Sequence, residues 1–271
     1  MDHLSVDDER SFRHVALYAD LKEILFRERY VFRVLRGMSS GRMDRALVLN
    51  LTYWGATGGD VLDSDHVPAD VVAHAAWHHL AARALGIVPG LDPSAEALFL
   101  GESIASAFDI YLVGRLLGHA PNSEFLETQV LAMAEASSAA GLAGRDFESL
   151  LQEVARDPEG AFADLRQLLY DASLALFRCR GAEEALAALV RSDAHRFGPL
   201  LHHYELSNWV LYALAYARDA RGSDRRTSAV ESALRAERDP LAWLISTWVT
   251  PALGAGVAAP DKSPRKKNRR S

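Results

Sequence analysis

The chain has 271 residues, of which 49% are hydrophobic and 24% are charged, and its formal net charge is -6 at pH 7. This length can bury a substantial core, and the acidic balance argues against broad, nonspecific nucleic-acid binding. The single cysteine, Cys179, excludes an internal disulfide and a zinc site built on cysteines. The polar N-terminus lacks the basic start and apolar run of a signal peptide, so we expect a cytoplasmic protein.

The first expected element is a long helix over Ser11 to Gly37, where apolar residues recur at roughly helical spacing. Met43 to Trp54 is ambiguous, because its Val, Leu, Thr and Tyr residues allow a strand while a helix suits its neighbours better. Gly55 to Asp60, GATGGD, predicts a flexible loop. This loop lacks the Lys-Ser/Thr ending of a phosphate-binding loop, so we assign it no nucleotide role.

The next expected helix, Val71 to Leu85, reads VVAHAAWHHLAARAL and carries two histidines on its apolar face. A proline and an acidic residue precede it, and both suit a first turn. At about 100° of rotation per residue, His74 and His78 share the apolar stripe. His79 is expected on the other side of the helix, near Arg83.

A second helix, Ala95 to Leu117, follows a turn rich in Gly and Pro and carries carboxylates on its apolar face. Glu102, Ser106 and Asp109 lie within its apolar stripe. Buried carboxylates need partners, because desolvating an unpaired charge costs several kcal/mol or more. A bound cation, or protonation of the histidines on the preceding helix, would meet that need.

The rest of the chain continues with helical periodicity, without convincing period-two alternation and without an internal repeat. We therefore predict an all-α protein, a multi-helix globular bundle in which short connections favour antiparallel neighbours. Residues 1–251 are expected to form a single helical domain that ends at Pro251. Residues 252–271 are expected to form a flexible linker and a disordered basic tail. The Ser, Thr, Pro and Gly residues between Leu241 and Ala259, and the tail that follows, argue against a membrane anchor there.

Histidines at positions i and i+4 of one helix can bind a metal ion through neighbouring turns. Glu102, facing inward from the next helix, is the natural third ligand beside His74 and His78. Asp109 is expected to orient one of the histidines without binding the metal, as carboxylates commonly do. Two histidines and one glutamate leave a coordination position open, which is typical of a catalytic rather than a structural zinc site.

HAAWH followed by GESIASAFD resembles the zinc-binding core of the gluzincin metallopeptidases, where one helix bears HExxH and the next bears a glutamate ligand. The resemblance implies zinc as the metal, His74 and His78 as the imidazole ligands and Glu102 as the third ligand. Asp109 is a loose counterpart of the later acidic residue of the family, because its spacing here is longer. The catalytic glutamate of the family follows the first histidine, and that position is Ala75 here. Loss of a general base typically costs about 10²–10⁴-fold in rate, so we do not expect standard peptidase activity.

Another histidine lies in Pro199 to Arg218, a strongly apolar stretch that we expect to be one helix. There His202 shares a face with Leu206 and Trp209. It is a candidate for supporting the metal site from outside the ligand set, or for donating to a substrate oxygen. The alternative for His202 is an ordinary role in or near the core.

The sequence leaves three classes of function open. The first is a metal-binding helical protein with a degenerate zinc-metallopeptidase-like site, which binds a ligand or hydrolyses with an altered base. The second is a non-catalytic scaffold or regulatory protein that acts through a protein partner, with the histidines and acids forming a metal-free polar network. The third is an adaptor that contacts nucleic acid or a membrane through the basic run Lys262 to Arg270.

Overall fold

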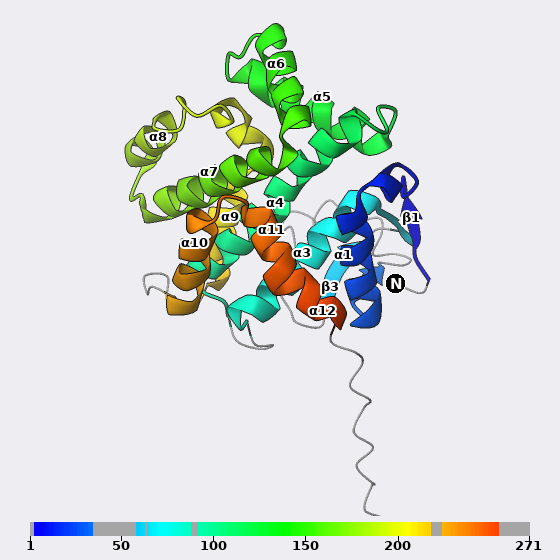
Figure 1. The fold of residues 1–271 in the computed structure, drawn as a ribbon. Coiled ribbons are helices and arrows are strands. Elements are labelled where there is room, and N and C mark those ends of the chain that lie inside the picture. The colour runs from blue at the N-terminus through cyan, green and yellow to red at the C-terminus, as the bar shows by residue number, and fades with distance from the viewer. Residues whose placement is uncertain (1–2, 35–57, 63, 88–91, 218–223, 255–271) are drawn as a thin grey trace, which may run out of the picture.

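A computed structural model of the chain describes residues 3–34, 58–62, 64–87, 92–217 and 224–254. Over these residues it confirms the all-α prediction, with long helices arranged around a central one and two short parallel sheets near the N-terminus (Figure 1). The expectations for Met43 to Trp54 and for the basic tail fall outside the described residues. The single domain over residues 1–251 stays a prediction.

Helix α4 (Ala95–Leu117) is the centre of the core. It packs most extensively against α7 (Pro158–Arg178) and α3 (Ala69–Leu85). The Oγ of Ser94 accepts a hydrogen bond from the amide of Ala97 and so caps the start of α4. Within the described ranges, α4 is the one helix long and apolar enough to cross a membrane, and 89% of its apolar window is buried inside the protein. Its apolar residues thus serve as packing surface for the surrounding helices.

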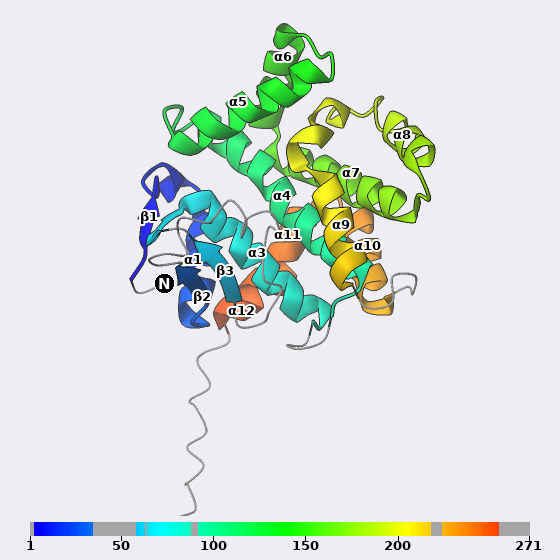
Figure 2. The same ribbon diagram turned by 180° about the vertical axis from the view of Figure 1, so that it is seen from behind.

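The expected continuous helix over Ser11 to Gly37 is wrong in its second half. A 3-10 turn, η1 (Ser11–His14), leads into α1 (Ala16–Arg27), and the chain then forms strand β2 (Val31–Val34). Strand β2 pairs in parallel with β3 (Gly58–Leu62), so part of the predicted GATGGD loop is also a strand. Both strands lie beside α1 and α3 (Figure 2). The β-branched and aromatic residues of β2 suit a strand once a partner is present.

A second small sheet fixes the start of α3. Strand β1 (Ser5–Asp7) pairs in parallel with β4 (His66–Pro68), with Ser5 opposite His66. The middle residue of β4, Val67, is fully buried, and Pro68 follows it as the residue that precedes the first turn of α3. The histidine helix therefore begins at a position held by the N-terminal strand.

The other helices cover α4 and α7 from several sides (Figures 1 and 2). In chain order they are α5 (Glu124–Ala139), α6 (Gly144–Arg156), α8 (Ala182–Val190), η4 (Gly198–Tyr204), α9 (Leu206–Tyr216), α10 (Arg225–Ala236) and α11 (Pro240–Leu244). A π-helical turn, η5 (Ile245–Val249), joins α11 to α12 (Thr250–Gly254). The helical run therefore continues through Pro251, where we expected it to end. An interior proline lacks the N–H of the helical hydrogen bond and crowds the preceding turn, and here that preceding turn is the π-helical η5.

Candidate metal centre

His74, His78 and Glu102 converge between α3 and α4. The Nε2 atoms of His74 and His78 lie 2.9 Å apart. The Oε2 atom of Glu102 lies 3.5 Å from Nε2 of His78 and 3.8 Å from Nε2 of His74. The structure thus brings together the three residues that the sequence proposed as ligands, and the group is close enough to hold a metal ion.

The convergence follows from the two helices that carry the residues. The spacing of four residues returns α3 to the same face, so the two imidazole rings lie next to each other along it, tilted by 57° with centroids 4.7 Å apart. The side chains are graded in exposure, with His78 4% exposed, Glu102 16% and His74 29%. The group is therefore buried on the His78 side and accessible to solvent on the His74 side.

Burial and the charges within the group together set its protonation. Burial, and then the charge of His78, lowers the pKa of His74 to about 4, so this imidazole is neutral at pH 7. Burial disfavours the ionised form of Glu102, but the charge and hydrogen bond of His78, and then His74, outweigh it and lower the pKa of the carboxyl. A neutral imidazole and an ionised carboxylate are the forms in which these side chains bind metals.

The three separations also match the size of a coordination site. A tetrahedral zinc ion with bonds of about 2.1 Å to its ligands holds the ligand atoms about 3.4 Å from one another. The observed separations of 2.9, 3.5 and 3.8 Å lie on both sides of that value. A single ion can therefore contact all three atoms after shifts of a few tenths of an ångström. Imidazole and carboxylate ligands together suit zinc and other first-row divalent metals.

His79 lies on the opposite side of α3 and does not replace the missing base. Its Nε2 atom is 2.6 Å from Oε2 of Glu28, and Arg83 binds the other oxygen of the same carboxylate. The predicted position of His79 near Arg83 is confirmed. Glu28, at the end of α1, was missed because it is 51 residues away in sequence. The position after His74 is Ala75, whose methyl group cannot move a proton.

Asp109 lies on α4 two turns beyond Glu102, and no described hydrogen bond or ion pair joins it to His74. The orienting role of Asp109 stays a prediction. Burial, and then the charges of Asp70 and Glu102, raises the pKa of Asp109 well above its usual value. Asp70, one turn before His74 on α3, thus belongs to the same acidic environment, although the sequence indicated only a first-turn carboxylate.

The predicted single helix over Pro199 to Arg218 is wrong. The chain breaks at Glu205, which has a left-handed backbone with φ of +48°, and 3-10 helix η4 lies before the break and α9 after it. His202 is exposed on η4, whereas Leu206 is buried, so the two do not share one face. The break reorients the turn that carries His202, and no described contact joins this histidine to the metal-ligand group.

Tyr204 is the residue of η4 that approaches the acidic group. It is buried, and burial together with the charge of Asp109 raises the pKa of its hydroxyl well above the usual value. No sequence pattern indicated Tyr204, because its proximity to Asp109 depends on the packing of η4, which lies far along the chain. Its hydroxyl has no hydrogen-bond partner in the described part of the protein.

Comparisons of the chain with protein-family models, with curated proteins and with solved structures found no match. What the centre can bind follows from its donor atoms. Those atoms are two imidazole nitrogens and one carboxylate oxygen, on two packed helices, within 3.8 Å of one another.

Proposed function

We propose that this protein is a metal-binding helical protein in which His74, His78 and Glu102 hold one zinc ion. The observation that supports the proposal best is the agreement between the three ligand-atom separations and the edge of a tetrahedral zinc site. The neutral state of His74 and the ionised state of Glu102 support it further. Three protein ligands leave one coordination position open, at which a bound zinc ion would supply a Lewis acid.

The proposed centre is similar to a degenerate gluzincin site, with the ligand pattern kept and the general base lost. Ala75 stands where that family carries its catalytic glutamate, and His79 is bound to Glu28. We therefore propose that the protein lacks standard peptidase activity and that its function depends on a ligand bound at the metal. The pairing of His79 with Glu28 leaves the base of any altered hydrolysis unassigned.

Elemental analysis of the purified, untagged protein after loading with zinc tests the proposal. We expect about one zinc ion per chain in the wild type and a loss of that zinc in His74→Ala, His78→Ala and Glu102→Gln. His202→Ala is the matched control, because this histidine is exposed and outside the group. Circular dichroism establishes that each variant is folded. Equal zinc in the wild type and in all three ligand variants would remove these residues as ligands.

A scaffold or regulatory protein with a metal-free polar core is the second candidate. The 2.9 Å separation between the two Nε2 atoms favours it, because one imidazole N–H can donate to the other nitrogen without an ion. Leu211 and Leu214 on α9 are 63% and 59% exposed and offer an apolar surface to a protein partner. In this case zinc leaves the melting temperature unchanged, and so does a chelator.

We propose a cytoplasmic location, which the free Cys179 supports. Contact with nucleic acid or a membrane through Lys262 to Arg270 stays a prediction, because the run lies outside the described residues. Deleting residues 261–271 tests it, since a contact of this kind is salt-sensitive and is lost with the basic side chains.

A further inference from the structure

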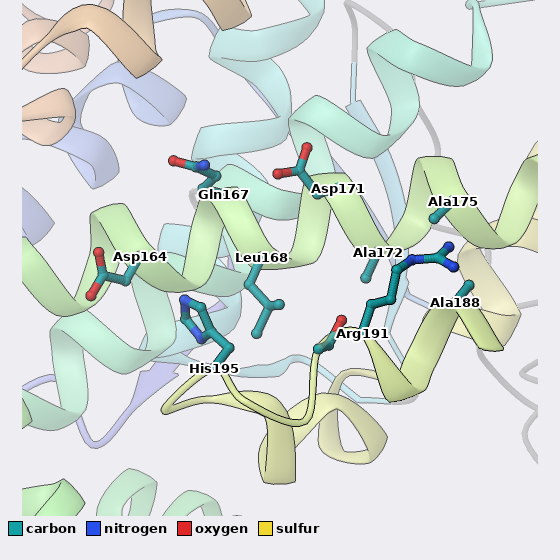
Figure 3. Close-up of a pocket in the computed structure, with 10 residues that line it drawn as sticks. Asp164, Gln167, Leu168, Asp171, Ala172, Ala175, Ala188, Arg191 and His195 are labelled. Carbon is teal, nitrogen blue, oxygen red and sulfur yellow. The ribbon is translucent and has the colours of Figure 1, made fainter. Parts of the chain in front are cut away.

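A cavity of about 390 Å³ lies between α7, the end of α8 and the segment that follows α8 (Figure 3). None of its lining residues belongs to α3 or α4, so it is separate from the proposed metal centre. Its volume falls in the range of small-molecule sites. The apolar part of its lining consists of short side chains and one leucine: Leu168, Ala172, Ala175 and Ala188.

Two acidic residues of α7 line the cavity, and each is already paired. Oδ2 of Asp164 lies 2.6 Å from Nη2 of Arg196, and Oδ1 of Asp171 binds Arg235 of α10. Arg196 also lies 3.8 Å from Glu153, so the two carboxylates share one guanidinium and the Asp164 side of the cavity keeps one negative charge. Arg191, at the end of α8, lines the cavity and has no ion pair with any residue in the described ranges. The positive charge left uncompensated along the wall is therefore that of Arg191.

His195 and Arg191 lie at opposite ends of the cavity, with Leu168 and Ala172 between them (Figure 3). Nδ1 of His195 accepts a hydrogen bond from the amide of Phe197 at 3.2 Å, so the neutral ring carries its proton on Nε2. Burial lowers the pKa of His195, with the charge of Asp164 opposing and that of Arg196 adding to the effect, so the ring is neutral at pH 7. It therefore offers a single N–H donor.

We propose that this cavity binds a short aliphatic carboxylate with a hydroxyl or carbonyl oxygen at its far end. The guanidinium of Arg191 pairs with the carboxylate of the ligand, the alanines contact its aliphatic carbon atoms, and the N–H of His195 donates to its far oxygen. Asp164, beside His195, repels a negative group at that end and so fixes the orientation. Leu168 and Ala175 lie about 10 Å apart along α7, which suits a chain of about six carbon atoms.

Isothermal titration calorimetry with three probes of six carbon atoms each tests this inference. The first, 6-hydroxyhexanoate, carries a carboxylate and a hydroxyl at its two ends. Hexanoate carries the carboxylate alone, and 1,6-hexanediol carries two hydroxyls and no charge. We expect saturable binding of 6-hydroxyhexanoate, binding of hexanoate that is about tenfold weaker, and no binding of the diol. The result is expected to be the same with zinc and with a chelator, because the cavity shares no residue with the metal centre.

Variants locate the binding. Arg191→Gln is expected to weaken 6-hydroxyhexanoate at least about tenfold, whereas Arg145→Gln, on an 87% exposed side chain outside the cavity, leaves it unchanged. Ala175→Leu is expected to abolish binding by filling the space, and His195→Ala to reduce 6-hydroxyhexanoate to the affinity of hexanoate. Absence of saturable binding at millimolar concentrations would overturn the proposal. Wild-type affinity in a folded Arg191→Gln or Ala175→Leu protein would also overturn it.

Discussion

The α3–α4 group and the α7–α8 cavity both draw polar side chains from neighbouring helices, but they arrange them differently. In the first, the Nε2 and Oε2 atoms of His74, His78 and Glu102 lie within 3.8 Å of one another. In the second, Arg191 and His195 lie at opposite ends of an apolar wall (Figure 3). Converging donors suit a single ion, and separated donors suit a molecule long enough to reach both.

The largest expected effect comes from removing a converging donor. His78→Ala takes away the most deeply buried ligand, and we expect the zinc affinity to fall by at least about 100-fold, since even partners outside a ligand set contribute 10–100-fold. Competition with a zinc-binding dye measures this change. Arg191→Gln removes a group of the cavity and is expected to leave the zinc affinity unchanged. An equal loss in both variants would show that the two regions are not independent.

The stability of the zinc-free protein is expected to depend on pH through His74, because burial holds this imidazole in its neutral form. The pKa of His74 is about 4 in the folded protein, and that of an unburied histidine, as in the unfolded chain, is 6.5. Between these two pH values the unfolded chain therefore binds more protons than the folded protein. The contribution of His74 to the free energy of unfolding is therefore fully present above pH 6.5. About 3 kcal/mol is lost as the pH falls toward 4.

Urea unfolding of the wild type and of His74→Gln at several pH values isolates this contribution. The comparison is needed because Asp109, whose pKa is raised, contributes with the opposite sign over part of the same range. We expect the free energy of unfolding of the wild type to fall relative to that of His74→Gln between pH 6.5 and 4. A constant difference across this window would contradict a lowered pKa for His74.

Zinc itself is expected to stabilise the folded state. At a free zinc concentration 100 times the dissociation constant, the gain in the free energy of unfolding is about 2.7 kcal/mol, because the three donors converge only in the folded protein. Thermal unfolding with zinc and with a chelator measures the shift. Glu102→Gln is expected to abolish the shift, and His202→Ala to retain it. A shift that survives in Glu102→Gln would place the ion elsewhere.

A smaller effect is expected on the other side of α3. Glu28→Gln weakens the charged contacts of His79 and Arg83 and is expected to lower the free energy of unfolding by about 1–2 kcal/mol. The zinc affinity is expected to stay the same, because this pair joins α3 to α1 and not to α4. Urea unfolding and zinc competition on the same sample check both statements. A loss of zinc in this folded variant would mean that His79 contributes to the metal centre.

The parts of the fold that depend on local periodicity could be predicted from the sequence. Helix α4 begins and ends as expected, and α3 begins two residues earlier than expected. The approach of Glu102 to His74 and His78 was predictable because both helices carry polar residues on apolar faces and follow one another in the chain. Two adjacent amphipathic helices joined by a short turn tend to pack together.

The parts that depend on distant partners could not be predicted. Strand β2 requires β3 beside it, and Glu28 reaches His79 only after α1 packs on α3. The break at Glu205 depends on one residue in a left-handed conformation, which helical periodicity does not reveal. The apolar wall of the α7–α8 cavity consists of alanines and one leucine whose spacing in sequence indicates only well-packed helices.

One zinc ion is expected to bind where His74, His78 and Glu102 converge. Anomalous diffraction from a zinc-loaded crystal, recorded on both sides of the zinc absorption edge, tests it most directly. We expect a single strong peak about 2.1 Å from the two Nε2 atoms and from a carboxylate oxygen of Glu102. A zinc-loaded crystal with no peak between α3 and α4, and with the two imidazoles still hydrogen-bonded to each other, would contradict it.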